Sequence, residues 1–149
     1  MNKLLFALLI PAACGTSSPD VTIGSTPLAG KVEGTAWTFK AGATDSFLSD
    51  AKGFFTDFYA SSFTACTGQP PSGPSLIVNL PKQPGSYPMS LSQNMTFTDG
   101  MSDNKIATEG TIRIDTVTAT QITGGLHGIY DGNNEVNGTF TVTVCPPMM

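Results

Sequence analysis

Apolar and polar residues alternate along most of the chain after residue 30, with the period of two that is typical of strands with one buried face. The alternation is clearest in three C-terminal runs, residues 110–117, 122–130 and 136–144. The turn-forming sequence DGNN at residues 131–134 separates the last two runs. We therefore predict that these three strands form an antiparallel meander.

The N-terminal part of this pattern predicts two further strands. The first follows Lys31 and places Trp37, its largest apolar residue, on the same side as Phe39. The second covers residues 53–60, where Phe54 and Phe58 fall on one face of a strand. The aromatic spacing in residues 53–60 also fits a short helix, and the strand is the preferred interpretation.

The middle of the chain adds a short strand and a long one. The proline-rich segment 66–75 is predicted to be a loop, because proline removes backbone donors. Residues 75–80 form a short apolar run, which is followed by turn residues at 81–85. In residues 87–97 the apolar side chains occupy odd positions, which predicts one long amphipathic strand kinked near Gln93.

These segments amount to about seven or eight strands without a convincing helix. The expected fold class is therefore all-β, a single antiparallel domain built as a sandwich or a partly closed barrel. A chain of 149 residues has room for one such domain, which we place at residues 30–149. The formal net charge of −4 disfavours nucleic acid as a partner.

The N-terminus has the pattern of an export signal, assigned here to residues 1–13. Lys3 precedes an apolar run from Leu4 to Ile10 that is too short to span a bilayer. The residues Ala-Ala-Cys that end at Cys14 resemble a lipobox, although Pro11 departs from the usual aliphatic residue. The resemblance implies lipidation of Cys14 and anchoring in the membrane. The alternative is ordinary cleavage, which would give a soluble periplasmic or secreted protein.

The segment after the cysteine predicts how the domain is held. Residues 14–29 are rich in Ser, Thr, Gly and Pro, which is typical of a flexible tether. Gly15 stands where some lipoproteins carry the Asp that retains them at the inner membrane, so the resemblance favours the outer membrane.

Cys66 and Cys145 remain once Cys14 is assigned to lipidation. Two remaining cysteines in an exported protein predict a disulfide between them. The bridge would close a loop of roughly 80 residues, and the chain-entropy model gives it about 4.5 kcal/mol as an upper value.

The C-terminal half also resembles uncharacterised envelope lipoproteins of bacteria. The resemblance rests on the sequences PGSYP, GTIRI, TQITGGLHG and VNGTFTVTVC, where a final cysteine follows the last strand. It implies the fold and the envelope location. It brings no established activity to any residue.

The sequence offers little catalytic or metal-binding chemistry. His127 is the only histidine, and no GxSxG nucleophile elbow is present, so a hydrolase is disfavoured. Met89 and Met95 share the predicted inward face, which favours core packing over copper binding. The acidic residues are scattered along turns and polar faces, and nothing in their spacing indicates a metal site, a cofactor or a catalytic pair.

Two hypotheses about function follow. The first is a lipid-anchored, non-enzymatic module that contacts an unknown envelope protein. The second is a barrel that binds a small apolar ligand. The residues that would line its interior are Trp37, Phe54, Phe58, Tyr87 and Phe97.

Overall fold

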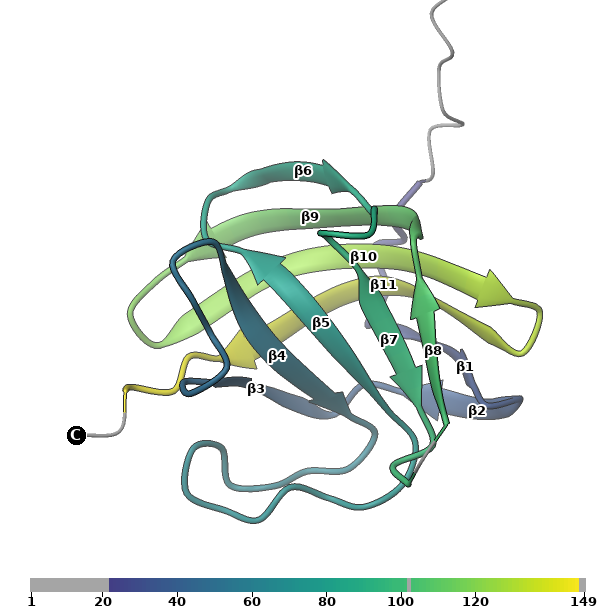
Figure 1. Cartoon of the computed structure of the whole chain (residues 1–149), viewed down its shortest axis with the longest axis horizontal. Coiled ribbons are helices and arrows are strands. Elements are labelled where there is room, and N and C mark those ends of the chain that lie inside the picture. Colours follow the sequence, from purple (N-terminus) through teal and green to yellow (C-terminus); the bar gives the residue numbers. More distant parts are fainter. Residues whose placement is uncertain (1–21, 102, 148–149) are drawn as a thin grey trace, which may run out of the picture.

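The computed structural model describes residues 22–101 and 103–147, and these residues form one curled β-sheet without a helix (Figure 1). The all-β fold class is therefore as predicted. The strands are β1 (Ala29–Val32), β2 (Thr35–Thr38), β3 (Ala41–Asp45), β4 (Gly53–Tyr59), β5 (Ser75–Pro81), β6 (Gly85–Pro88), β7 (Met95–Thr98), β8 (Asn104–Ala107), β9 (Glu109–Val117), β10 (Gln121–Asp131) and β11 (Asn134–Thr143).

The strands follow the order β6–β9–β10–β11–β3–β4–β5–β7–β8, and the β1–β2 hairpin attaches to β11. The predicted meander is confirmed, because β10 pairs with both β9 and β11 in antiparallel register. The preferred strand at residues 53–60 is confirmed as β4. The sheet curls so that β9–β11 lie behind β4, β5 and β7 in Figure 1, with the core between them.

The sheet is mixed, whereas an exclusively antiparallel domain was expected. β11 runs parallel to β3, and the pair meets at Thr143 and Ala43. Hairpins force antiparallel pairing on strands that follow each other directly, but β3 and β11 lie far apart in the sequence. No short turn fixes their relative direction, and the alternation pattern carries no information on it.

The sheet has eleven strands, more than the seven or eight predicted. β3 and β8 lie where no strand was predicted, and two segments expected to be single strands are broken by turns. The first break falls at Glu33 and Gly34, which adopt positive φ angles of 51° and 73° and form the β1–β2 hairpin. A turn with two left-handed residues matches the twist of a hairpin. The backbone NH of Glu33 donates to Oδ1 of Asn134 at 2.9 Å, which ties this turn to the start of β11.

The second break divides the predicted strand 87–97 into β6 and β7. The NH of Ser90 donates to the carbonyl of Gln93 at 2.8 Å, and Nδ2 of Asn94 donates to the carbonyl of Leu91 at 2.9 Å. Ser and Asn side chains compete with a strand by bonding to nearby backbone groups, and Oγ of Ser90 also accepts a hydrogen bond from the NH of Gln93 at 3.2 Å. Leu91, expected on the buried face, is consequently 86% exposed.

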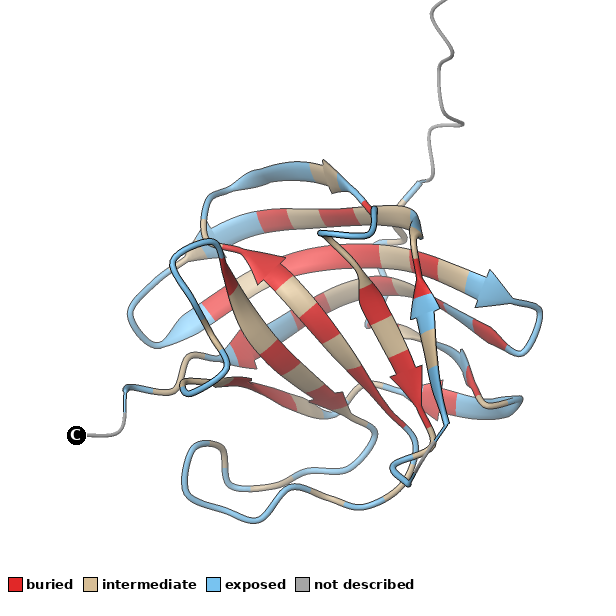
Figure 2. Ribbon diagram, in the orientation of Figure 1, coloured by how far each residue is buried: buried red, intermediate tan, exposed pale blue. Residues whose placement is uncertain are grey.

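The inner faces of the curled sheet form one apolar core (Figure 2). Phe58 on β4 is fully buried in this core, with its ring 5.1 Å from that of Phe140 and 5.3 Å from that of Phe39. Met89 and Met95 are buried in the same core, as the sequence predicted. Dense packing of this kind leaves large side chains in contact with one another.

Residues 22–28 lie along β11, although the sequence analysis included them in the tether 14–29. The NH of Leu28 donates to the carbonyl of Thr139, and the NH of Thr139 donates to the carbonyl of Thr26, both at 2.8 Å. The side chain of Leu28 is fully buried. The folded unit therefore begins before residue 30, because these residues continue the sheet beyond β1.

Candidate functional site

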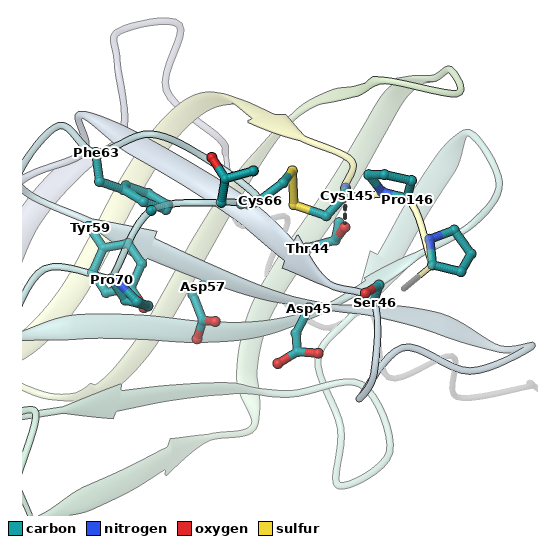
Figure 3. Close-up of a pocket in the computed structure, with 14 residues that line it drawn as sticks. Thr44, Asp45, Ser46, Asp57, Tyr59, Phe63, Cys66, Pro70, Cys145 and Pro146 are labelled. Atoms are coloured by element: carbon teal, nitrogen blue, oxygen red, sulfur yellow. Dashed lines mark hydrogen bonds between the residues drawn. A yellow bond between two sulfur atoms is a disulfide. The ribbon is translucent and has the colours of Figure 1, made fainter. Parts of the chain in front are cut away.

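A surface hollow of about 380 Å³ lies where β3 and β4 meet the segment 60–74 and the C-terminal tail (Figure 3). The strands contribute its floor through the residues that point away from the core. The segment and the tail contribute its rim. The lining residues are Ala43, Thr44, Asp45, Ser46, Asp57, Tyr59, Phe63, Cys66, Thr67, Gly68, Pro70, Cys145, Pro146 and Pro147.

Two carboxylates lie in the floor of the hollow. Asp57 pairs with Ala43 across β3 and β4, and Asp45 pairs with Phe55, so the two acids are diagonal neighbours on the same face. Figure 3 shows both side chains projecting from the same side of the sheet. No Lys, Arg or His occurs among the described residues that line the hollow. The two negative charges therefore face each other without a cation in the wall.

The environment of Asp57 is unfavourable for its charge. Its side chain is partly buried, and burial together with repulsion by Asp45 raises the pKa of its carboxyl from 3.8 to about 6. No hydrogen bond to this carboxylate is found among the described residues. Asp45 differs, because its Oδ1 accepts hydrogen bonds from the NH groups of Phe47 and Leu48 at 2.7 and 2.9 Å. A titratable group perturbed in this way inside a cleft is a candidate for function.

Aromatic rings bound one end of the hollow. Tyr59 and Phe63 meet edge to face, with ring centroids 5.2 Å apart. Partial burial and the nearby Asp57 raise the pKa of the Tyr59 hydroxyl to about 12, so it stays protonated at physiological pH. Pro70 lies beside Tyr59 in Figure 3. The hollow thus combines apolar walls with an acidic floor.

The predicted disulfide is present and forms part of the rim. Cys66 and Cys145 are bonded, with Cα atoms 5.3 Å apart. The backbone NH of Cys145 donates to Oγ1 of Thr44 at 2.8 Å, which fixes the tail on β3. The bridge thereby holds the segment 60–74 over the outer face of β4.

Trp37 holds the far end of the same segment, since its Nε1 donates to the carbonyl of Pro74 at 3.1 Å. Trp37→Phe keeps a buried ring and removes this donor. We expect it to lower the free energy of unfolding by about 1 kcal/mol and to speed amide exchange in residues 60–74. Urea denaturation and hydrogen exchange measure the two effects. Unchanged exchange in that segment would show that the indole does not hold it.

The five aromatic residues predicted as a ligand lining lie elsewhere. Trp37, Phe58 and Phe97 belong to the buried core, and Phe54 and Tyr87 pack against it. Trp37 also borders a separate surface pocket between β2 and the segment 60–74. The five side chains pack into the core and do not come together at the hollow.

The remaining predictions about sites concern His127, metals and Cys14. His127 lies on β10, away from the hollow, and its Nε2 is 3.0 Å from Oε1 of Glu135. No cluster of three or more His, Cys, Asp or Glu suited to a metal occurs among the described residues. Cys14 lies outside the described residues.

Sequence reasoning did not identify the Asp45–Asp57 pair. The pair depends on β3, whose sequence AGATD has no alternation of large apolar residues. It also depends on the register between β3 and β4, which brings residues 12 positions apart onto one surface. The only local signal was an acid between Phe55 and Tyr59 on the outward face of a predicted strand.

Comparison with known proteins assigns this chain to no group: no family model, curated protein or solved structure matches it. No helix among the described residues is long and apolar enough to cross a membrane.

Proposed function

We propose that this chain is an exported, non-enzymatic binding module of the cell envelope, anchored through a lipid on Cys14, and that the hollow on β3 and β4 is its binding site. The observation that carries the proposal is Asp57. Its carboxylate is partly buried in an open hollow, and no hydrogen-bond or cationic partner for it is found among the described residues. Folding alone gives no reason to keep such a residue, whereas a bound partner would supply one.

Export is supported by the Cys66–Cys145 disulfide, since structural disulfides persist in oxidising compartments. The lipid anchor and the outer membrane are inferred from the lipobox-like residues that end at Cys14 and from Gly15.

Binding is favoured over catalysis by the different surroundings of the two acids. An acid–base pair of the glycosidase type needs both carboxyl groups free to face one substrate. Oδ1 of Asp45 is instead occupied by two backbone NH groups of the following turn. The filled core likewise favours a surface site over a ligand inside a barrel.

Native mass spectrometry of the protein extracted from its own membranes tests this function. We expect a lipid-sized mass increment that Cys14→Ser removes, together with a loss of membrane association in cell fractionation. We also expect a retained partner, and the Tyr59→Ala/Phe63→Ala double variant should release it. An unlipidated chain in the soluble fraction would refute the anchor. A partner that stays bound to the double variant would refute the hollow as the site.

A further inference from the structure

We propose that the hollow receives a basic side chain, lysine or arginine, from an exposed segment of a partner protein. The inference rests on the proposed function, because it names the chemistry of the partner that the hollow would bind. Three features of the structure support it: the unmatched charge of the floor, the shape of the walls and the charge of the whole chain.

The floor lacks a positive charge that a partner can provide. Asp57 and Asp45 repel each other, and none of the described residues that line the hollow is cationic. An incoming ammonium or guanidinium group would bond to Asp57 and also offset this repulsion. Hydrogen bonds in which the donor or the acceptor carries a charge are stronger than hydrogen bonds between neutral groups. The floor is therefore complementary to a cation and repels an anionic group.

The walls suit the apolar stem of such a side chain. Lysine and arginine carry three or four methylene groups that pack against apolar surface while the charged head remains polar. Tyr59, Phe63 and Pro70 form this surface at one end of the hollow. An aromatic ring also attracts a cation that lies over its face. A compact metal ion would make no use of these walls.

The net charge of the whole chain also favours a basic partner. The formal net charge is −4, so a basic segment is attracted before it makes contact. This long-range attraction is screened by salt, whereas the contact at Asp57 is partly buried. Salt should therefore slow association more than it weakens the bound state.

Binding should depend on pH through the charge of Asp57. The groups that face this carboxyl are Asp45 on β3 and Tyr59 on β4, and among the described residues neither the segment 60–74 nor residues 145–147 add a titratable group to the lining. Since the pKa of Asp57 is about 6, most of its charge is lost at pH 5. The affinity for a basic peptide should fall about tenfold between pH 7.5 and pH 5.

Calorimetric titration of the mature chain with acetyl-tetralysine-amide tests the proposal, with acetyl-tetraglutamine-amide as the uncharged probe. We expect saturable binding of the basic peptide only, and a loss of about tenfold in Asp57→Asn. The matched control is Glu109→Gln, which removes one negative charge at an exposed position on β9. This control should retain binding within about twofold, because it leaves the hollow unchanged.

Three results of the titration would overturn the inference. They are absence of saturable binding, equal weakening by Glu109→Gln and Asp57→Asn, and tighter binding of spermidine than of the peptide, which would point to a free polyamine. A neutral molecule retained in the hollow during native mass spectrometry would also overturn the basic partner. That last outcome would leave the hollow intact as the binding site, so the two proposals can fail separately.

Discussion

Replacing Cys66 and Cys145 by serine is expected to lower the free energy of unfolding by up to about 4.5 kcal/mol. The bridge joins residues 79 positions apart, so its removal frees a large loop in the unfolded chain. A loss of this size is a major share of the stability of a small domain. Urea denaturation of the double variant and of the oxidised, unaltered protein measures the difference.

The same substitution should act locally on the hollow. The segment 60–74 is held by the disulfide near its middle and by the Trp37 indole at its end. Loss of the bridge should therefore speed amide exchange there before the meander β9–β11 is affected. Reduction of the unaltered protein should reproduce both effects, and Cys14→Ser should reproduce neither. A stability loss below about 1 kcal/mol would mean that the unfolded chain is already compact between the two cysteines.

The parts of the fold that the sequence predicted are those that depend on local alternation. In β9, Ile112 and Ile114 point into the core while their neighbours face solvent, as the period of two requires. The disulfide was predicted by elimination, since Cys66 and Cys145 were the only cysteines left. Neither inference needed knowledge of contacts between distant strands.

Turns formed by polar side chains were harder to predict. The sequence around Leu91 keeps its alternation, yet hydrogen bonds made by Ser90, Gln93 and Asn94 break the strand there. Glu33 gives little warning of a hairpin, because its left-handed conformation is supported by Asn134, the first residue of β11, 101 positions away in the sequence. Long-range hydrogen bonds of this kind leave no periodic signal in the sequence.

The candidate site was the least predictable feature. Asp45 and Asp57 looked like ordinary solvated acids, and only the pairing of β3 with β4 makes them neighbours. The segment 60–74 forms part of the rim around Asp57. This segment forms neither helix nor strand. Such a site forms where an irregular loop packs on the outer face of a sheet. The alternation of apolar and polar residues carries no information about that packing.

Asp57→Asn is expected to stabilise the protein at neutral pH while it weakens binding. Folding raises the pKa of this carboxyl from 3.8 to about 6, so the folded chain holds its proton to higher pH than the unfolded chain does. Stability is therefore lost as the pH rises from about 4 to 6, and the penalty remains at higher pH. The shift corresponds to at most about 3 kcal/mol, and solvent screening reduces this to about 1–2 kcal/mol.

Urea denaturation at pH 7.5 and pH 3.5 measures this effect. The gain from Asp57→Asn should appear at pH 7.5 and nearly vanish at pH 3.5, where the carboxyl is mostly protonated in both states. Glu109→Gln, an exposed change of equal charge, should shift stability by less than about 0.5 kcal/mol at either pH. A variant less stable at pH 7.5 would show that the Asp57 carboxylate contributes to folding. A stabilised variant that no longer binds would identify Asp57 as a residue retained for binding at the expense of stability.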